Sequence, residues 1–417
     1  MIRYLALFLT LLFLAVSVAA QADNESSCVG CHLEQDPPYS TPAELFSADI
    51  HAGAGFSCDA CHGGDPEAWD YDEAKDPTRG FIGVPARNKV VEVCGKCHND
   101  PSLMRRYNPN LATDQTAKFW TSGHGSSLKR GAKGAAECAA CHGAHGIKRS
   151  SDPGSPVYHA NVAETCAKCH SDERLMKKFK LPHELVGQYR GSVHGVALLE
   201  HGDVAAPTCN NCHGNHGAAP PEVGSIQEVC GTCHVNNQAL FNQTKMKSVF
   251  TTQGLHGCVV CHTAHDIQRL EDNTLSATTG VCAQCHEPND TGAIQAASLL
   301  VVLDSLSSAL NGAQEVLHDA ENRGLEVEEL LLDMQNARSA LVQSRTMVHT
   351  FDVGDVREEA DPGFELASQV HQASMQLIRN FSMRRIGLGI ATILISFLAV
   401  MLYLYIRTLD KTTNGTR

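Results

Sequence analysis

The sequence predicts a mainly α-helical chain with much irregular loop. A cysteine-rich array should be followed by an antiparallel helical bundle and one C-terminal transmembrane helix. Three observations support this expectation. A short motif of two cysteines and one histidine recurs between residues 28 and 286. Apolar residues then recur with heptad spacing from Leu299 to Phe381. An uninterrupted apolar run occupies 386–406.

Residues 1–20 are predicted to form a signal peptide. Arg3 precedes an apolar run that ends in small residues, and cleavage is expected after Ala20 or Ala22. Export would place the rest of the chain where disulfides and covalent cofactors can form. The alternative interpretation is an uncleaved membrane anchor.

Every cysteine belongs to a Cys-x-x-Cys-His motif, and we number these motifs 1 to 9 in chain order. The nine motifs use all 18 cysteines of the chain: Cys28 and Cys31, Cys58 and Cys61, Cys94 and Cys97, Cys138 and Cys141, Cys166 and Cys169, Cys209 and Cys212, Cys230 and Cys233, Cys258 and Cys261, and Cys282 and Cys285. Each motif ends in a histidine: His32, His62, His98, His142, His170, His213, His234, His262 and His286.

This spacing is typical of covalently attached haem c. Two thioether bonds anchor the porphyrin, and the adjacent histidine becomes the proximal ligand of the iron. A zinc ribbon needs paired cysteines but no histidine at the next position, and a disulfide framework needs neither pattern. The sequence therefore favours nine covalent haems over zinc or disulfides.

Composition agrees with a chain that is built around cofactors. Only 6% of the 417 residues are aromatic, and the motif region is too short for an aliphatic core around each haem. The porphyrins are therefore expected to form most of the apolar interior. The net charge of −13 argues against nucleic acid as a partner. It fits an electron-transfer surface that attracts a basic partner, or solubility alone.

Further histidines follow a repeat around the even-numbered motifs. One lies upstream of each even motif: His51, His124, His194 and His256. A spare histidine follows motifs 4, 6 and 8 but not motif 2: His145, His216 and His265. The unit occurs about four times behind a single leading motif, which indicates a modular array.

These motifs resemble those of the paired-CxxCH multihaem cytochromes c. That group includes the pentahaem donor of nitrite reductase, octahaem tetrathionate reductase and hydroxylamine oxidoreductase, and the resemblance covers residues 28–290. It implies that the seven upstream and spare histidines are distal iron ligands. His145 is too close in sequence to reach the far face of its own haem, so it should bind a neighbouring one. A surface or propionate-binding role is the alternative.

Two more distal ligands are needed if all nine irons are capped on both sides. His159 precedes Cys166 by seven residues, as His51 precedes Cys58, and is the eighth choice. His349 is the ninth, because a second long helix would return it to the haems. Capping of that helix end is the competing explanation for His349. His183, His201, His318 and His371 are less favoured.

The cysteine-free part after residue 290 is predicted to form the bundle. Its first two apolar stripes meet at Gly324, where the chain should reverse. The expected domains are a haem domain at 21–290, a helical bundle or stalk at 291–383, a transmembrane helix at 384–407 and a cytoplasmic tail at 408–417. The 386–406 run is about 31 Å long as a helix, which is one bilayer core. The bundle is also a candidate for contacts between copies of the chain.

Two classes of function remain open. If histidine caps both faces of every iron, the protein is a respiratory electron carrier without catalytic residues. Its haem domain would lie in the periplasm, anchored in the inner membrane by the single C-terminal span. Its expected partners are a membrane quinol dehydrogenase and periplasmic cytochromes or a reductase. If one iron is open, the protein is an oxidoreductase for a small nitrogen or sulfur compound. The carrier is favoured.

The motif count makes a direct prediction about mass. Mass spectrometry of the denatured chain should show nine covalent haem additions after signal removal. Bound zinc, or fewer than seven haems in a host with haem-attachment machinery, would contradict this interpretation of the motifs.

Overall fold

The computed structural model describes residues 26–218, 224 and 226–414. The expected signal peptide and the last three residues of the expected tail lie outside the described part. Within it, the prediction of a mainly α chain with much irregular loop is confirmed, because these residues form helices and loops and no strand. The chain divides into two compact units. The first is 1–229 with 263–268, and the second is 230–262 with 269–417.

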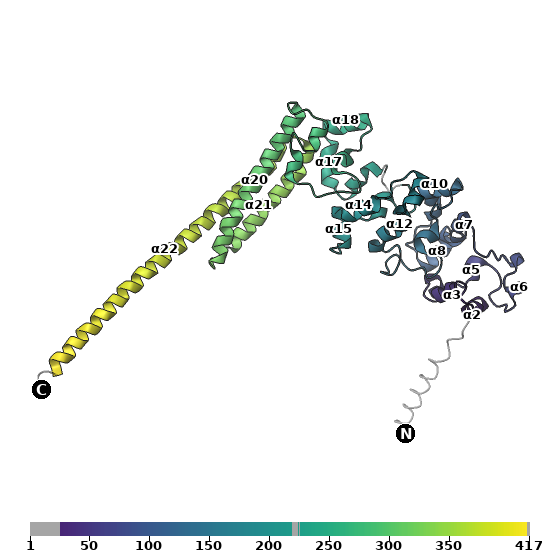
Figure 1. Cartoon of the computed structure of the whole chain (residues 1–417), viewed down its shortest axis with the longest axis horizontal. Coiled ribbons are helices and arrows are strands. Elements are labelled where there is room, and N and C mark those ends of the chain that lie inside the picture. The colour runs from purple at the N-terminus through teal and green to yellow at the C-terminus, as the bar shows by residue number, and fades with distance from the viewer. Residues whose placement is uncertain (1–25, 219–223, 225, 415–417) are drawn as a thin grey trace, which may run out of the picture. The chain divides into compact units, whose positions relative to one another are not determined.

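The first unit consists of short helices joined by loops (Figure 1). Its α-helices are α2 Ser27–Leu33, α3 Thr41–Phe46, α4 Ile50–Gly53, α5 Asp59–His62, α6 Tyr71–Ala74, α7 Arg87–His98, α8 Pro101–Tyr107, α9 Gln115–Thr121, α10 Gly123–Lys129, α11 Cys138–His142, α12 Val162–His170, α13 Glu173–Phe179, α14 Leu185–Gly191, α15 Val193–Leu199 and α16 Cys209–His213. Two 3-10 turns, η1 Pro77–Arg79 and η2 His159–Asn161, lie between them, and a third, η3 Ile226–Thr232, spans the unit boundary.

Side-chain caps explain where many of these short helices begin. Asp100 accepts hydrogen bonds from the amides of Ser102 and Leu103 at the start of α8. Ser122 and Ser192 cap α10 and α15 in the same way. Aliphatic packing contributes little by comparison: one described cluster of this unit contains only Val91, Phe119, Leu128 and Ala135 as buried members.

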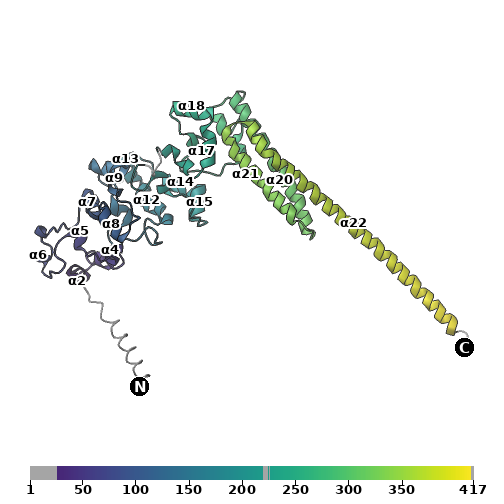
Figure 2. The same cartoon turned by 180° about the vertical axis from the view of Figure 1, so that it is seen from behind.

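The second unit combines three Cys-x-x-Cys-His motifs with a large helical bundle. Its shorter helices are α17 Val235–Asn242, α18 Lys245–Gln253, α19 Gly257–His262, η4 Asp272–Leu275 and η5 Val281–Gln284. The bundle helices are α20 Thr291–Asn322, α21 Glu328–Met347 and α22 Val353–Asn414, with the turn η6 Val348–Thr350 before α22. Helix α21 runs antiparallel to α20 and α22 (Figures 1 and 2).

The heptad stripes form the core of this bundle. The whole first stripe is buried: Leu299, Leu303, Leu306, Leu310, Ala313, Leu317 and Ala320. Gly324 has a positive φ of 71°, a conformation that favours glycine, and it reverses the chain as expected. The start of α22 adds Val356 and Ala360, both fully buried, which the sequence patterns did not single out.

Helix α22 continues from the bundle into the expected membrane span without a break. It extends well beyond the ends of α20 and α21 (Figure 2). Its segment Val353–Leu409 is long and apolar enough to cross a membrane, and the most apolar stretch is exposed. Helix α20 passes the same test of length and composition, but its apolar face is covered by the bundle. The C-terminal part of α22 is therefore the candidate membrane span.

The buried stripe generates a prediction about stability. Leu306→Ala should lower the free energy of unfolding of the bundle by about 2–5 kcal/mol, because Leu306 is fully buried and a cavity would remain. Val301→Ala on the same helix should cost less than about 0.5 kcal/mol, because Val301 is 64% exposed. Denaturant unfolding of the full chain in detergent, followed by circular dichroism, measures both. Equal losses would contradict the assigned core.

Candidate functional site: paired histidines at the cysteine motifs

Most Cys-x-x-Cys-His motifs form one helical turn that ends at the histidine. Motifs 1 to 6 end α2, α5, α7, α11, α12 and α16 or lie within them, and motif 8 ends α19. Motifs 7 and 9 lie at the 3-10 turns η3 and η5. Residues three and four apart share one face of a helix, so this turn presents both cysteines and the histidine on the same side. That arrangement is what attachment of one porphyrin requires.

The turn is closed by glycine after three of the motifs. Gly63, Gly143 and Gly214 follow the histidines of motifs 2, 4 and 6 with φ of 70°, 84° and 78°. Residues with a β-carbon adopt such angles rarely. The glycines therefore let the chain leave the helix immediately after the proximal histidine.

Six motif histidines face a second histidine within the described residues. The ring centroids lie 5.8–6.1 Å apart in each pair. The pairs are His98 with His51, His62 with His145, His170 with His124, His142 with His216, His213 with His265, and His262 with His349. Each joins segments that are far apart in the sequence, and each lies within a single compact unit.

This separation fits an iron between the two rings. Bonds from imidazole nitrogen to a transition metal are about 2 Å long, so imidazoles on opposite sides of one iron have centroids about 6 Å apart. Among the described residues no three His, Cys, Asp or Glu side chains gather as a zinc site would need. Two ligands suffice for haem iron, because the porphyrin supplies the other four. The residues present therefore fit haem c.

The relative orientation of the rings alternates along the chain. In the pairs of motifs 2, 4, 6 and 8 the rings are nearly parallel, with interplanar angles of 13°, 9°, 7° and 8°. In the pairs of motifs 3 and 5 the angles are 88° and 58°. Even-numbered and odd-numbered motifs thus have different local geometries.

Burial favours the neutral form of most of the paired rings. Desolvation lowers the pKa of nine paired histidines and is the largest cause in each case: His98, His124, His142, His145, His170, His213, His216, His262 and His265. It also lowers the pKa of His349. Neutral imidazole is the form that binds a metal, because the lone pair of one nitrogen must be free.

Hydrogen bonds at Nδ1 orient several of these rings. The carbonyl oxygen of Gly83 is 2.8 Å from Nδ1 of His62, and that of Thr346 is 2.8 Å from Nδ1 of His349. Asp49 Oδ1 lies 2.9 Å from Nδ1 of His51. A proton on Nδ1 leaves the Nε2 lone pair available for a metal.

Asp49 is a site residue that sequence reasoning missed. Its carboxylate is only 4% exposed, and it accepts hydrogen bonds from the His51 amide at 2.9 Å and from the Ile147 amide at 2.8 Å. The Ile50 amide in turn donates to the Ile147 carbonyl oxygen at 2.8 Å. The segment that follows the spare His145 is thereby fastened to the upstream segment that carries His51. The Asp-x-His spacing at 49–51 was the available signal.

A matching contact recurs later in the first unit. The Val193 amide, next to His194, donates to the Ile267 carbonyl oxygen at 2.8 Å, two residues beyond the spare His265. The segment after a spare histidine thus docks on an earlier upstream segment in both places. This docking explains how His145 and His265 reach earlier motifs.

No disulfide joins the cysteines, and the first cysteine of each odd-numbered motif up to motif 7 meets that of the next even-numbered motif. Hydrogen bonds join Cys28 with Cys58, Cys94 with Cys138, Cys166 with Cys209 and, in the second unit, Cys230 with Cys258. Each odd-numbered motif therefore lies beside the next even-numbered one. Porphyrins attached at two such motifs would therefore have adjacent attachment points.

Not every expected ligand meets a motif histidine. His159 Nε2 lies 2.9 Å from the carbonyl oxygen of Ala206, a hydrogen bond that competes with iron at that nitrogen. Within the described residues no ring contact joins His256 to a motif histidine. His32 and His286 make hydrogen bonds through Nδ1, to the Tyr39 carbonyl oxygen and to Asp290. The residues His194 and His234 each make contacts with other residues of the chain.

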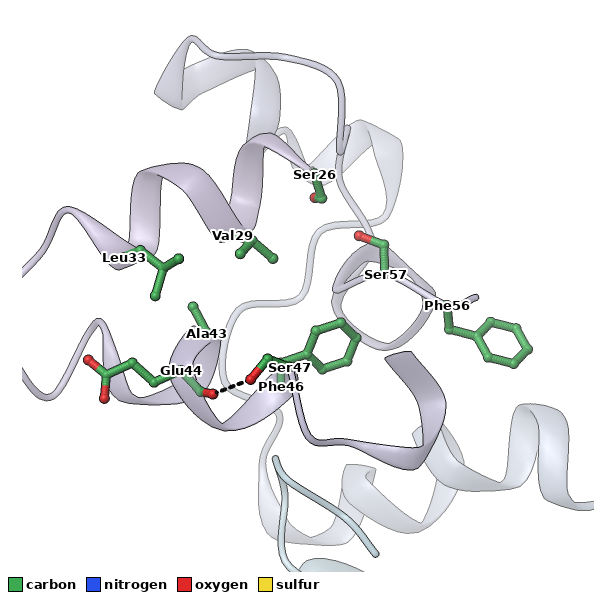
Figure 3. Close-up of a pocket in the computed structure, with 9 residues that line it drawn as sticks. All are labelled: Ser26, Val29, Leu33, Ala43, Glu44, Phe46, Ser47, Phe56 and Ser57. Carbon is green, nitrogen blue, oxygen red and sulfur yellow. Dashed lines mark hydrogen bonds between the residues drawn. The ribbon is translucent and has the colours of Figure 1, made fainter. Parts of the chain in front are cut away.

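A pocket of about 360 Å³ lies beside motif 1, between α2 and α3 (Figure 3). Val29, which stands between the two cysteines of the motif, points into it together with Leu33 (Figure 3). Its other lining residues are Ser26, Ala43, Glu44, Phe46, Ser47, Phe56 and Ser57. The mostly apolar lining is suited to an apolar group near the first motif.

Comparison with known proteins agrees with this geometry. A family model described as cytochrome c3 matches residues 50–171. The multiheme cytochrome MtrA of Shewanella baltica (strain OS185) is 24% identical over 226 residues, which are 51% of this chain and 53% of that protein. The chain thus spans about half the length of this curated relative. No solved structure matches the chain.

These similarities support a multihaem cytochrome c with covalent c-type haems and a role in electron transfer. They reach the same class of protein as the motifs and the ring pairs.

The packing around His124 generates a prediction. A β-carbon at Gly125 would lie 2.0 Å from the Phe119 carbonyl oxygen, whereas one at Gly123 would meet nothing within 4 Å. Gly125→Ala should therefore displace His124 and convert one haem per chain from low spin to high spin. Gly123→Ala is the matched control and should leave the spectrum unchanged. Optical and electron paramagnetic resonance spectra of the purified protein measure both, and an unchanged Gly125→Ala spectrum would contradict the expectation that this packing positions His124.

Proposed function

We propose that this chain is a membrane-anchored nonahaem c-type cytochrome of the periplasm. It passes electrons along mostly bis-histidine haems, from a quinol-dependent donor in the membrane to a periplasmic acceptor. The observation that carries the proposal is the set of facing imidazole pairs with centroids about 6 Å apart.

The proposed axial ligands follow two rules. A spare histidine binds the haem attached two motifs earlier, which the pairs of His145 with motif 2, His216 with motif 4 and His265 with motif 6 support. An upstream histidine binds the haem of the odd-numbered motif that follows, which the pairs of His51 with motif 3 and His124 with motif 5 support. By the second rule, His256 binds the haem of motif 9.

His349 takes the place of a spare histidine for motif 8. Its ring is parallel to that of His262 within 8°, as in the other even-numbered pairs, at a centroid distance of 6.0 Å. The turn η6 carries it, and Phe351 beyond that turn packs against Phe241 of α17. The bundle thereby supplies a ligand to the haem array of its own unit. We propose a structural role for His159, since its Nε2 is hydrogen-bonded to a carbonyl oxygen.

Capping on both faces determines what such irons can do. Haem c supplies one-electron redox chemistry when it is bound, at a potential that depends on ligands, burial and local charge. The chain's own histidines occupy the positions where a substrate would bind. They leave electron exchange as the available activity.

The membrane attachment proposed here rests on α22. Its apolar stretch is flanked by Arg384 and Arg385 on one side and by Arg407 on the other, so charge asymmetry does not orient it. Haem attachment outside the inner membrane places the haem units in the periplasm and residues 408–417 in the cytoplasm. One continuous helix then joins the proposed ligand-bearing bundle to the membrane.

Replacing a proposed distal ligand tests the pairing. His145→Ala should produce one high-spin, carbon monoxide-binding haem at motif 2, and His349→Ala should produce one at motif 8, because each leaves one iron face uncapped. Spectra of the oxidised protein and carbon monoxide titration of the reduced protein measure the change against the wild type. His183→Ala is the control, because His183 contacts Glu184 and no motif histidine.

Double variants identify the haem that opens. The new signal of His145→Ala should vanish when C58A/C61A removes the haem of motif 2, and it should persist when C138A/C141A removes that of motif 4. The opposite pattern would mean that His145 binds the haem of its own motif and would overturn the first rule.

A further inference from the structure

We infer that the haem attached at motif 1 has no protein ligand on its second face, so that its iron binds a small neutral molecule of the diatomic class. Carbon monoxide is the probe for this site. The inference rests on the proposed ligand pairing, because motif 1 is the motif that neither pairing rule reaches.

The two pairing rules provide no histidine for motif 1. Every spare histidine binds two motifs back from an even-numbered motif, and so reaches even-numbered haems. The two upstream histidines that face a motif histidine, His51 and His124, each pair with an odd-numbered motif later in the chain than themselves. Motif 1 precedes the first upstream histidine, His51, and residues 1–31 contain no histidine. The array therefore has an unmatched first member.

The neighbourhood of motif 1 offers no substitute ligand. Residues 26–85 contain His32, His51 and His62, no methionine, and Lys75 as the single lysine. His51 faces His98, and His62 faces His145. The Lys75 ammonium lies 4.4 Å above the ring of Tyr71, where a cation–π contact holds it.

Two more distant histidines of the first unit have other contacts. His159 Nε2 is hydrogen-bonded to the Ala206 carbonyl oxygen, and His183 contacts Glu184. Helix α2 is instead fastened locally, because it packs on α3 and because the Ser27 amide and hydroxyl both donate to the Pro66 carbonyl oxygen. Nothing in this packing directs α2 toward those histidines.

The charge around motif 1 selects the kind of ligand. Residues 26–85 carry eleven acidic side chains and two basic ones, and many of the acidic ones are exposed, including Glu34, Asp36 and Asp72. Such a surface repels small anions. A neutral diatomic molecule experiences no such repulsion, and the nearby pocket between α2 and α3 is mostly apolar.

The experiment uses the purified full-length holoprotein in detergent. After reduction with dithionite, carbon monoxide titration should reach one molecule per chain. C28A/C31A, which mass spectrometry should show to carry eight haems, should lose this binding. C282A/C285A, which removes the haem of motif 9, is the matched control and should keep it.

A second variant covers the case in which C28A/C31A does not fold. His32→Tyr retains both thioether bonds but changes the ligand opposite the bound carbon monoxide, so it should shift the iron–carbon stretching frequency in resonance Raman spectra. An unshifted frequency, or binding that survives in C28A/C31A, would overturn the assignment to motif 1. A wild type that binds no carbon monoxide would overturn this inference alone. A wild type that binds several molecules would overturn the ligand pairing on which it rests.

Discussion

The arrangement of this protein depends on pairs of imidazole rings that face each other at a distance that one metal ion would span. The separation is nearly constant, at 5.8–6.1 Å between centroids, although the paired residues come from different repeats. Such a pair connects segments up to 87 residues apart without a large aliphatic core. Covalent attachment then makes the proposed cofactor a permanent part of that connection.

The supporting interactions are small and local. Nδ1 hydrogen bonds to carbonyl oxygens or to Asp49 orient the rings, and glycines allow the close backbone approaches around them. Burial lowers the pKa of most of the paired histidines, including His142 and His262, and so favours the neutral form. The alternation between parallel and crossed rings gives even-numbered and odd-numbered sites different geometries, which is a means of tuning neighbouring haems differently.

The second unit combines two ways of stabilising a structure. Its bundle buries a continuous apolar stripe, as ordinary antiparallel helices do. The same bundle ends in the turn that carries His349 beside His262. The bidentate ion pair between Arg345 and Asp272, at 2.9 and 2.8 Å, fastens α21 to the loop before motif 9. The proposed membrane anchor and a proposed haem ligand therefore belong to one packed set of helices.

The sequence by itself determined the local features. The two cysteines and the histidine of a motif lie within one helical turn, so their spacing alone places them together. Heptad periodicity specifies a buried helix face whatever element packs against it. Motif identity and the bundle stripes were therefore predictable, as was the return of His349 toward the haem motifs. The burial of Val356 and Ala360 was not predicted, because these residues precede the recognisable apolar stripe on α22.

The pairing of histidines was decided only by the tertiary structure. His145 and His216 follow their motifs with the same spacing, so their sequences alone do not say which earlier motif each one meets. That choice depends on contacts such as Ile50 with Ile147 and Val193 with Ile267, which join segments from different repeats. His159 matched the spacing of His51, yet its ring lies against Ala206. Sequence spacing determines which side chains lie on the same face of one helical turn. A pair of ligands, in contrast, requires packing to bring two distant turns together.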